Sequence, residues 1–90
     1  ANLDQSEVRA AEENLKRTRQ FFDEKMIACE THLLVRGMEP GEDIVTFARE
    51  QGVDEIIIGV KSRSKVGKLI FGSTAQAVIL QAHCPVVTVK

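Results

Sequence analysis

The short run Ile56–Ile57–Ile58, which ends at Gly59, constrains the fold more than any other stretch of the chain. Three consecutive β-branched apolar residues favour a strand, and the run is too short for a buried helix. Because its residues are apolar at successive positions, we expect both faces of this strand to be covered, as in a parallel sheet. The run therefore predicts a strand over residues 53–59 inside an α/β fold.

Helical patterns alternate with strand patterns along the whole chain. Apolar residues recur at helical spacing from about residue 6 to residue 25, and Asp4 or Ser6 can cap that helix. Residues Ile27–Arg36 alternate in the manner of a strand. A second helix is expected to begin near Pro40 and to stop at Gly52.

The C-terminal third continues this alternation. Ser73 and Gln76 match a capping box at the start of a third helix. Pro85 cannot continue that helix, and the valines after it predict a final strand within Pro85–Lys90. Helices that alternate with strands in this way predict an α/β fold with a parallel sheet, and 90 residues suit one domain, residues 1–90.

An anion site is expected where the central strand ends. Open α/β sheets bind ligands at the carboxyl ends of their strands, and a helix N-terminus offers free N–H groups and a positive dipole end. The loop between the strand and Gly72–Ser73–Thr74 carries only basic charges. These are Lys61, Arg63, Lys65 and Lys68. Strand end, basic loop and helix start together suit phosphate.

Composition argues against several other classes of protein. A formal net charge of −1 and an aromatic content of 4% argue against nucleic-acid binding, and no apolar run is long enough to span a membrane. Cys29 and Cys84 form no CxxC motif, so we expect reduced thiols in a cytoplasmic protein. His32 and His83 lack metal-ligand spacing, so neither a metal site nor a catalytic residue is predicted.

The glycines of this region resemble the nucleotide-binding signature of the universal stress protein family. The family's pattern is Gly, two residues, Gly, nine residues and then Gly-Ser or Gly-Thr. This sequence has a similar pattern, with Gly59, two residues, Ser62, nine residues and then Gly72–Ser73. Ser62 stands where the family has its second glycine. The stretches Val53–Asp54 and Ala82–Val87 also resemble the family, and the resemblance covers residues 37–90.

This resemblance implies a three-layer open parallel sheet of the adenine nucleotide alpha hydrolase-like, Rossmann-like type. The family's sheet has strand order 3-2-1-4-5, and its first strand, first helix and second strand have no counterpart in this sequence. We therefore expect residues 1–90 to be a universal stress protein-like domain that is incomplete at its N-terminus.

The resemblance also implies a function. It predicts ATP or another adenine nucleotide as ligand, alone or with Mg²⁺, and a homodimer formed through strand Pro85–Lys90. A stress-response regulator without predicted enzymatic activity is the first hypothesis. A dimeric interaction module that binds no nucleotide and a slow adenine-nucleotide hydrolase are the alternatives. The implied nucleotide-binding residues are Ile58, Gly59, Val60, Lys61, Ser62, Arg63, Gly72, Ser73 and Thr74.

Overall fold

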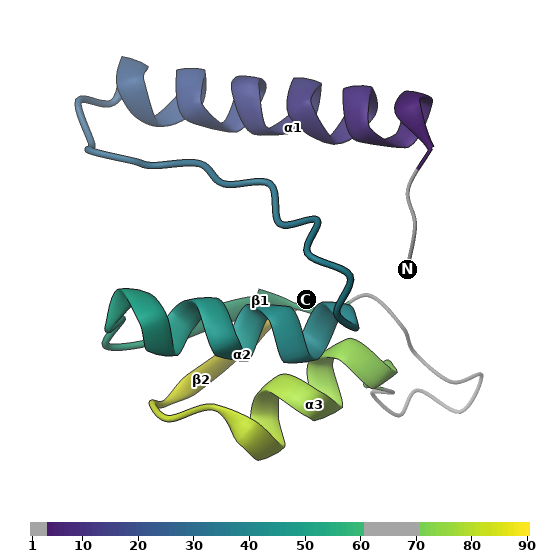
Figure 1. Ribbon diagram of the computed structural model, residues 1–90. Coiled ribbons are helices and arrows are strands. Elements are labelled where there is room, and N and C mark those ends of the chain that lie inside the picture. The colour runs from purple at the N-terminus through teal and green to yellow at the C-terminus, as the bar shows by residue number, and fades with distance from the viewer. Residues whose placement is uncertain (1–3, 61–70) are drawn as a thin grey trace. The chain divides into compact units, whose positions relative to one another are not determined.

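The computed structural model describes residues 4–60 and 71–90, which belong to two compact units, Ala1–Gly37 and Met38–Lys90 (Figure 1). Within these ranges, no helix is both long enough and apolar enough to cross a membrane.

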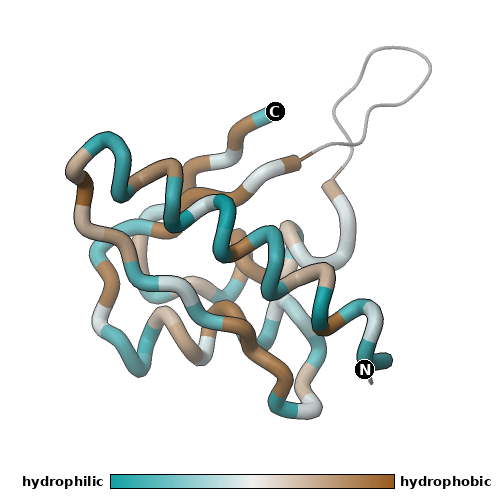
Figure 2. Tube along the Cα trace, turned by 90° about the horizontal axis from the view of Figure 1, so that it is seen from above, coloured by the Kyte–Doolittle hydropathy of each residue, from teal (hydrophilic) through white to brown (hydrophobic). Residues whose placement is uncertain are grey.

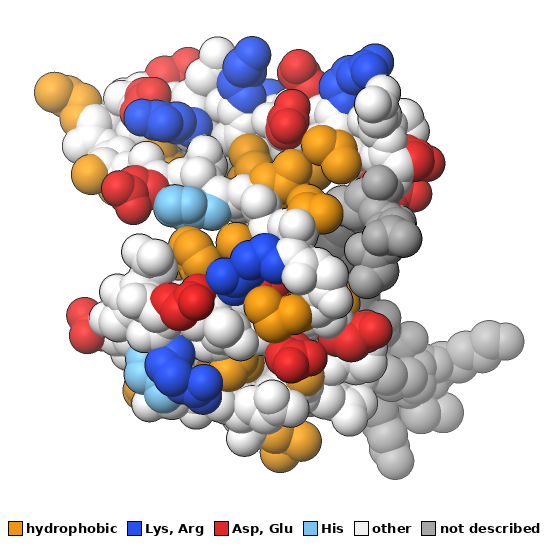
Figure 3. Space-filling model, viewed as in Figure 1, with side chains coloured by type: hydrophobic (Ala, Val, Ile, Leu, Met, Phe, Trp, Pro, Cys, Tyr) orange, Lys and Arg blue, Asp and Glu red, His pale blue; other side chains and the backbone are white. Residues whose placement is uncertain are grey.

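The first unit contains one long helix, α1 (Gln5–Glu24), close to the predicted range. The Asp4 side chain caps it by accepting a hydrogen bond from the Glu7 N–H at 2.8 Å, and the Ser6 hydroxyl donates to the same oxygen. No residue of α1 is buried. Most of its trace is hydrophilic in Figure 2, and acidic and basic side chains are interspersed over it in Figure 3.

The second unit begins with α2 (Pro40–Gln51). As predicted, Pro40 occupies the first turn, where its missing N–H costs nothing, and Gly52 ends the helix in the left-handed conformation at φ 64°. Strand β1 (Ile56–Gly59), helix α3 (Ser73–Gln81) and strand β2 (Val86–Val89) follow.

Strands β1 and β2 form a parallel pair, as alternating helices and strands predict. The register pairs Ile56 with Val86 and Gly59 with Val89. Hydrogen bonds close both ends of the ladder, from the Ile56 N–H to the Pro85 carbonyl at 3.0 Å and from the Val60 N–H to the Val89 carbonyl at 2.7 Å. The α/β class with a parallel sheet is therefore confirmed.

The core lies between one face of this sheet and the helices. Helices α2 and α3 pack against each other (Figure 1) and contribute Val45, Ala48 and Val78 to a cluster with Ile56. The opposite face of β1 is open within this unit, because both helices pack on the first face, and Ile57 is 65% exposed. The expectation that both faces of β1 are covered is therefore not met in this unit.

The predicted strand Ile27–Arg36 was wrong. Residues 27–36 form neither helix nor strand, and the ladder found in residues 4–60 and 71–90 joins β1 to β2. Alternating side chains indicate which residues can share a face, but a strand also needs a neighbouring strand to accept and donate its backbone hydrogen bonds. The sequence of this segment alone does not indicate whether such a neighbouring strand is present.

The predicted capping box at Ser73 was also wrong. Gly72 is the N-cap residue of α3, Ser73 is the first helical residue, and no side chain caps the helix. The Gln76 amide instead donates to the Phe71 carbonyl at 2.9 Å. The cap residue of α3 therefore lies one position before the residue that the motif indicates. The first N–H groups of the helix lack a side-chain acceptor.

We predict that Val78→Ala destabilises the protein by about 2 kcal/mol, because it removes two methyl groups from a side chain that is 0% exposed and leaves a cavity. Leu80→Ala, on the same helix but 81% exposed, is the matched control and should change the free energy of unfolding by about 0.5 kcal/mol or less. Urea unfolding followed by circular dichroism measures both. Equal losses would contradict the assignment of Val78 to the core.

A second prediction concerns the cap of α1. The hydrogen bond from the Glu7 N–H, followed by that from Ser6, lowers the pKa of Asp4 below its ordinary value. A lowered pKa in the folded state means that the cap stabilises α1 fully above the ordinary aspartate pKa, about 3.9, and is lost as the pH falls through the lowered value. Asp4→Ala should remove this acid-dependent loss of helix, measured by circular dichroism, whereas Asp23→Ala should leave it unchanged.

Candidate functional site

The carboxyl end of β1 is the first part of the candidate site. Ile58 is half-buried against the helices, and Gly59 is exposed. Alternate residues of a strand direct their N–H groups to opposite edges, so the Gly59 N–H lies on the edge away from β2. A Cβ placed on Gly59 would meet no described atom within 4 Å. No described atom therefore fills the space on the face of the strand to which a side chain at Gly59 would point.

Val60, another predicted site residue, is engaged in the sheet and the core. Its N–H donates to the Val89 carbonyl at 2.7 Å, and its side chain is buried. A backbone N–H that already donates to a strand neighbour is not available to a phosphate oxygen. Lys61, Ser62 and Arg63, the other predicted residues of this stretch, lie outside the described residues, as does the rest of the basic loop up to residue 70.

The start of α3 is the second part of the site. Gly72 caps the helix with extended backbone, φ −70° and ψ 171°, and the first helical hydrogen bond runs from the Gln76 N–H to the Gly72 carbonyl at 3.0 Å. The N–H groups of the turn between them have no acceptor within the helix. Ser73 is exposed and Thr74 is half-buried. This turn therefore presents donors and a positive dipole end to an anion.

A groove of about 300 Å³ runs beside this turn, between the first turn of α2 and the length of α3 from Ser73 to Gln81. Half of the residues that line it come from α3 and half from the start of α2 with the residue before it: Glu39, Pro40, Gly41, Glu42, Ser73, Thr74, Ala77 and Gln81. The groove includes two predicted site residues, Ser73 and Thr74, but not Ile58, Gly59 or Val60. Two carboxylates beside the turn disfavour a bare polyphosphate, and a divalent cation on the ligand would offset that repulsion.

The α2 side of this groove was missed by the sequence analysis. The packing of α2 on α3 brings Glu39, Gly41 and Glu42 beside Ser73, and no linear motif encodes that packing. The pair Pro40–Gly41 was the available signal, because a glycine inside the first turn of a helix often marks a close approach of another backbone.

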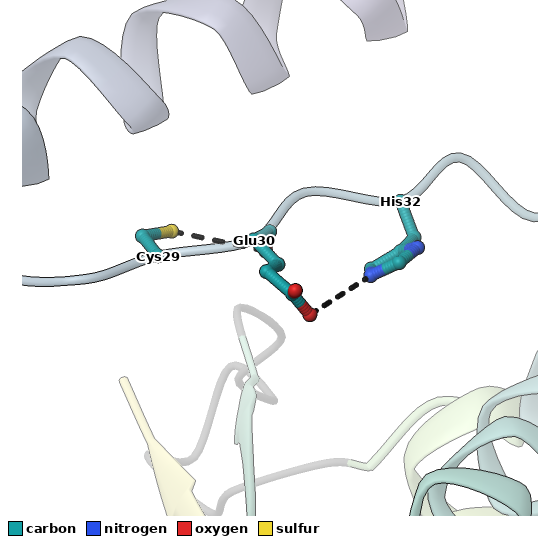
Figure 4. Close-up of polar contacts among 3 residues, drawn as sticks. All are labelled: Cys29, Glu30 and His32. Carbon is teal, nitrogen blue, oxygen red and sulfur yellow. Dashed lines mark hydrogen bonds and ion pairs between the residues drawn. The ribbon is translucent and has the colours of Figure 1, made fainter.

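A second polar cluster lies in the first unit, on the segment after α1 (Figure 4). The Cys29 thiol lies 3.8 Å from the Glu30 carbonyl oxygen, and His32 Nε2 lies 3.7 Å from a carboxylate oxygen of Glu30. In residues 4–60 and 71–90, no three or more His, Cys, Asp and Glu side chains are arranged to hold a metal ion. Cys29, Glu30 and His32 therefore do not form a set of metal ligands.

Comparison with known proteins assigns the chain to a family. A sequence model of the Universal stress protein family matches residues 1–90. The chain belongs to the universal stress protein family. The resemblance of Gly59, Ser62 and Gly72–Ser73 to the family's signature therefore identified the family correctly.

Individual universal stress proteins agree with this assignment. One from Methanocaldococcus jannaschii is 34% identical over 79 residues, which are 88% of this chain and 45% of that protein. One from Mycolicibacterium smegmatis is 35% identical over 54 residues, 60% of this chain and 42% of that protein. The chain thus spans about half the length of the curated relatives it matches.

A solved universal stress protein structure supports the fold. The protein from Archaeoglobus fulgidus is 44% identical, with a TM-score of 0.87 over 97% of this chain and 65% of that one. The Rossmann-like α/β fold of this universal stress protein is therefore shown by structure as well as by sequence.

Proposed function

We propose that this universal stress protein binds ATP or another adenine nucleotide, with Mg²⁺ on the phosphates, and acts as a dimeric regulator of the stress response in the cytoplasm. The observation that carries the proposal is the start of α3 at Gly72–Ser73–Thr74, where Gly72 and Ser73 are exposed and no side chain caps the helix. Its unpaired N–H groups are the feature that phosphate binding requires.

Two further features support a nucleotide. The open approach to Gly59 allows a sugar or phosphate to come close to the strand backbone. The sequence between Gly59 and Gly72 carries basic side chains and no acidic ones, a composition that suits a phosphate ligand. Binding, rather than turnover, is proposed because no general base is evident among the predicted site residues.

A pair of variants at Gly72 tests the proposed nucleotide binding. Aspartate and asparagine both cap helices well, and a Cβ at this position meets no described atom within 4 Å, so both variants should fold. We predict that Gly72→Asp weakens Mg²⁺-ATP binding by about a hundredfold, because its carboxylate occupies the N–H groups and repels phosphate. Gly72→Asn, which lacks the charge, should lose clearly less. Isothermal titration calorimetry measures both affinities.

A folded wild-type protein that shows no saturable binding of Mg²⁺-ATP would contradict the proposed nucleotide binding. The interaction module without nucleotide would then be the better account. Turnover of ATP that disappears in Gly72→Asp would instead favour the slow hydrolase.

The dimer is proposed through the outer edge of β2. The carbonyls of Pro85 and Val89 face β1, so the N–H and carbonyl groups of Thr88 face away from it. Such an edge can pair with the same edge of a second copy, antiparallel across a two-fold axis.

We predict that Thr88→Pro raises the dissociation constant of the dimer by at least about tenfold, because proline removes a donor from the outer edge and none from the ladder with β1. Thr88→Val keeps both the N–H and the branched shape, and is the matched control. Light scattering after size-exclusion chromatography reports the mass. A monomeric wild type, or a dimer unaffected by Thr88→Pro, would contradict the β2 interface.

A further inference from the structure

Helix α2 comes closest to α3 at Gly41. A Cβ placed on Gly41 would lie 2.6 Å from the Ala77 Cβ, 3.0 Å from the Thr74 carbonyl oxygen and 3.4 Å from the Thr74 Cα. Two of these atoms belong to the backbone of α3, and the third is fixed to it directly, so none can rotate away. Gly41 is itself buried. The space between the helices therefore accepts a hydrogen atom at this position but no side chain.

This demand distinguishes Gly41 from the other described glycines. Gly37 and Gly52 adopt positive φ and have open space where a Cβ would stand, so they serve the backbone rather than packing. Gly59 and Gly72 have neither a positive φ nor a neighbour within 4 Å. Within residues 4–60 and 71–90, Gly41 is thus the glycine whose missing side chain sets a distance between two elements.

The part of α3 that Gly41 contacts is its N-terminal half. Thr74 and Ala77 lie in the first two turns, and Ser73 and Thr74 line the same groove as Gly41. Further along the helix, Val78 is held separately by the core cluster with Val45, Ala48 and Ile56. The Gly41 contact therefore bears on the first two turns of α3, where Ala75 is the other buried residue.

A methyl group at Gly41 would move the first turn of α3. Carbon atoms in contact lie about 3.5–4.0 Å apart, so a separation of 2.6 Å falls short by about 1 Å and the two helix ends must part by that amount. Hydrogen bonds from N–H groups to charged oxygens hold their length within a few tenths of an ångström. A shift of this size is therefore large for an anion held by the first turn of α3.

We infer that Gly41 is a positioning residue of the phosphate site: it brings α2 close enough to fix where the first turn of α3 presents its N–H groups. It contacts Thr74 and Ala77 and does not touch the ligand. The inference rests on the proposed nucleotide binding, but it also makes a claim about the protein without ligand.

The experiment compares Gly41→Ala with two other variants. Ala77→Gly combined with Gly41→Ala removes the closest of the three contacts, although the Thr74 carbonyl remains near. Ala48→Val overpacks the buried C-terminal half of α2, away from the first turn of α3, and controls for a general loss of stability. Circular dichroism verifies folding. Where Gly41→Ala does not fold, Ala77→Ser enlarges the same contact from the α3 side and takes its place.

Calorimetry with Mg²⁺-ATP and with adenosine gives the first readout. Gly41→Ala should weaken Mg²⁺-ATP binding by about tenfold, which corresponds to 1.4 kcal/mol, while adenosine, which has no phosphate, keeps its affinity. The double variant should recover most of the loss. Ala48→Val should lower stability without this selective effect. Equal losses for ATP and adenosine, or a Gly41→Ala variant that binds ATP like the wild type, would overturn the inference.

Hydrogen exchange without nucleotide gives the second readout. The Gln76 N–H donates to the Gly72 carbonyl in the first helical hydrogen bond of α3, so its exchange rate reports the order of that turn. Gly41→Ala should accelerate its exchange, and the double variant should slow it again. Should the wild type bind no ATP, the proposed function fails, and this rate alone decides the positioning role: unchanged exchange in Gly41→Ala would refute it.

Discussion

The second unit depends on the parallel pairing of β1 with β2. A parallel pair cannot be joined by a tight turn, so the chain must leave β1, cross over one face through α3 and return beside its starting point. That crossover brings the start of α3 to the same end of the sheet as Gly59. Helix α2 then packs on α3 and covers the same face. The position of the candidate site is thus a consequence of strand topology, whereas its N–H groups are those that the first turn of any helix leaves without an acceptor in the helix.

Much of this fold could be predicted from sequence because its signals are local. Helix α1 has a repeating apolar pattern and an aspartate cap, and α2 has Pro40 at its start and Gly52 at its end. The strand predicted at Ile27–Arg36 failed because a strand is a relation between two segments, and one segment's pattern contains only half of that relation. The prediction that Ile57 is covered failed for a similar reason. Consecutive apolar residues indicate that a strand tolerates burial on both faces, but the elements that pack on it decide which face is covered.

The residues of the candidate site also fall into two groups, those that the local sequence indicates and those that the packing of distant segments adds. Gly59 and Gly72–Ser73 could be selected from the sequence because a glycine signature indicates where backbone must remain accessible, and their contact with a nucleotide stays a prediction. The role of Val60 could not be predicted in this way, since its N–H is used by Val89, a residue 29 positions further along the chain. The carboxylates of Glu39 and Glu42 enter the site only through helix packing. Their presence makes the electrostatics of the groove more mixed than the basic loop alone would indicate.

The hydrogen bond between His83 and Val53 has a consequence for strand alignment. His83 Nε2 lies 3.0 Å from the Val53 carbonyl, which can only accept, so the imidazole donates and joins the turn before β2 to the turn before β1. Six of the eight residues in the two strands, IIIG and VVTV, are branched and apolar, so hydrophobicity alone distinguishes weakly between this alignment and a shifted one. Contacts at the strand ends therefore contribute to the alignment. Residues outside the strands, His83 among them, would then help to decide which valines face the helices, and the strand interiors could exchange one branched apolar residue for another without losing that information.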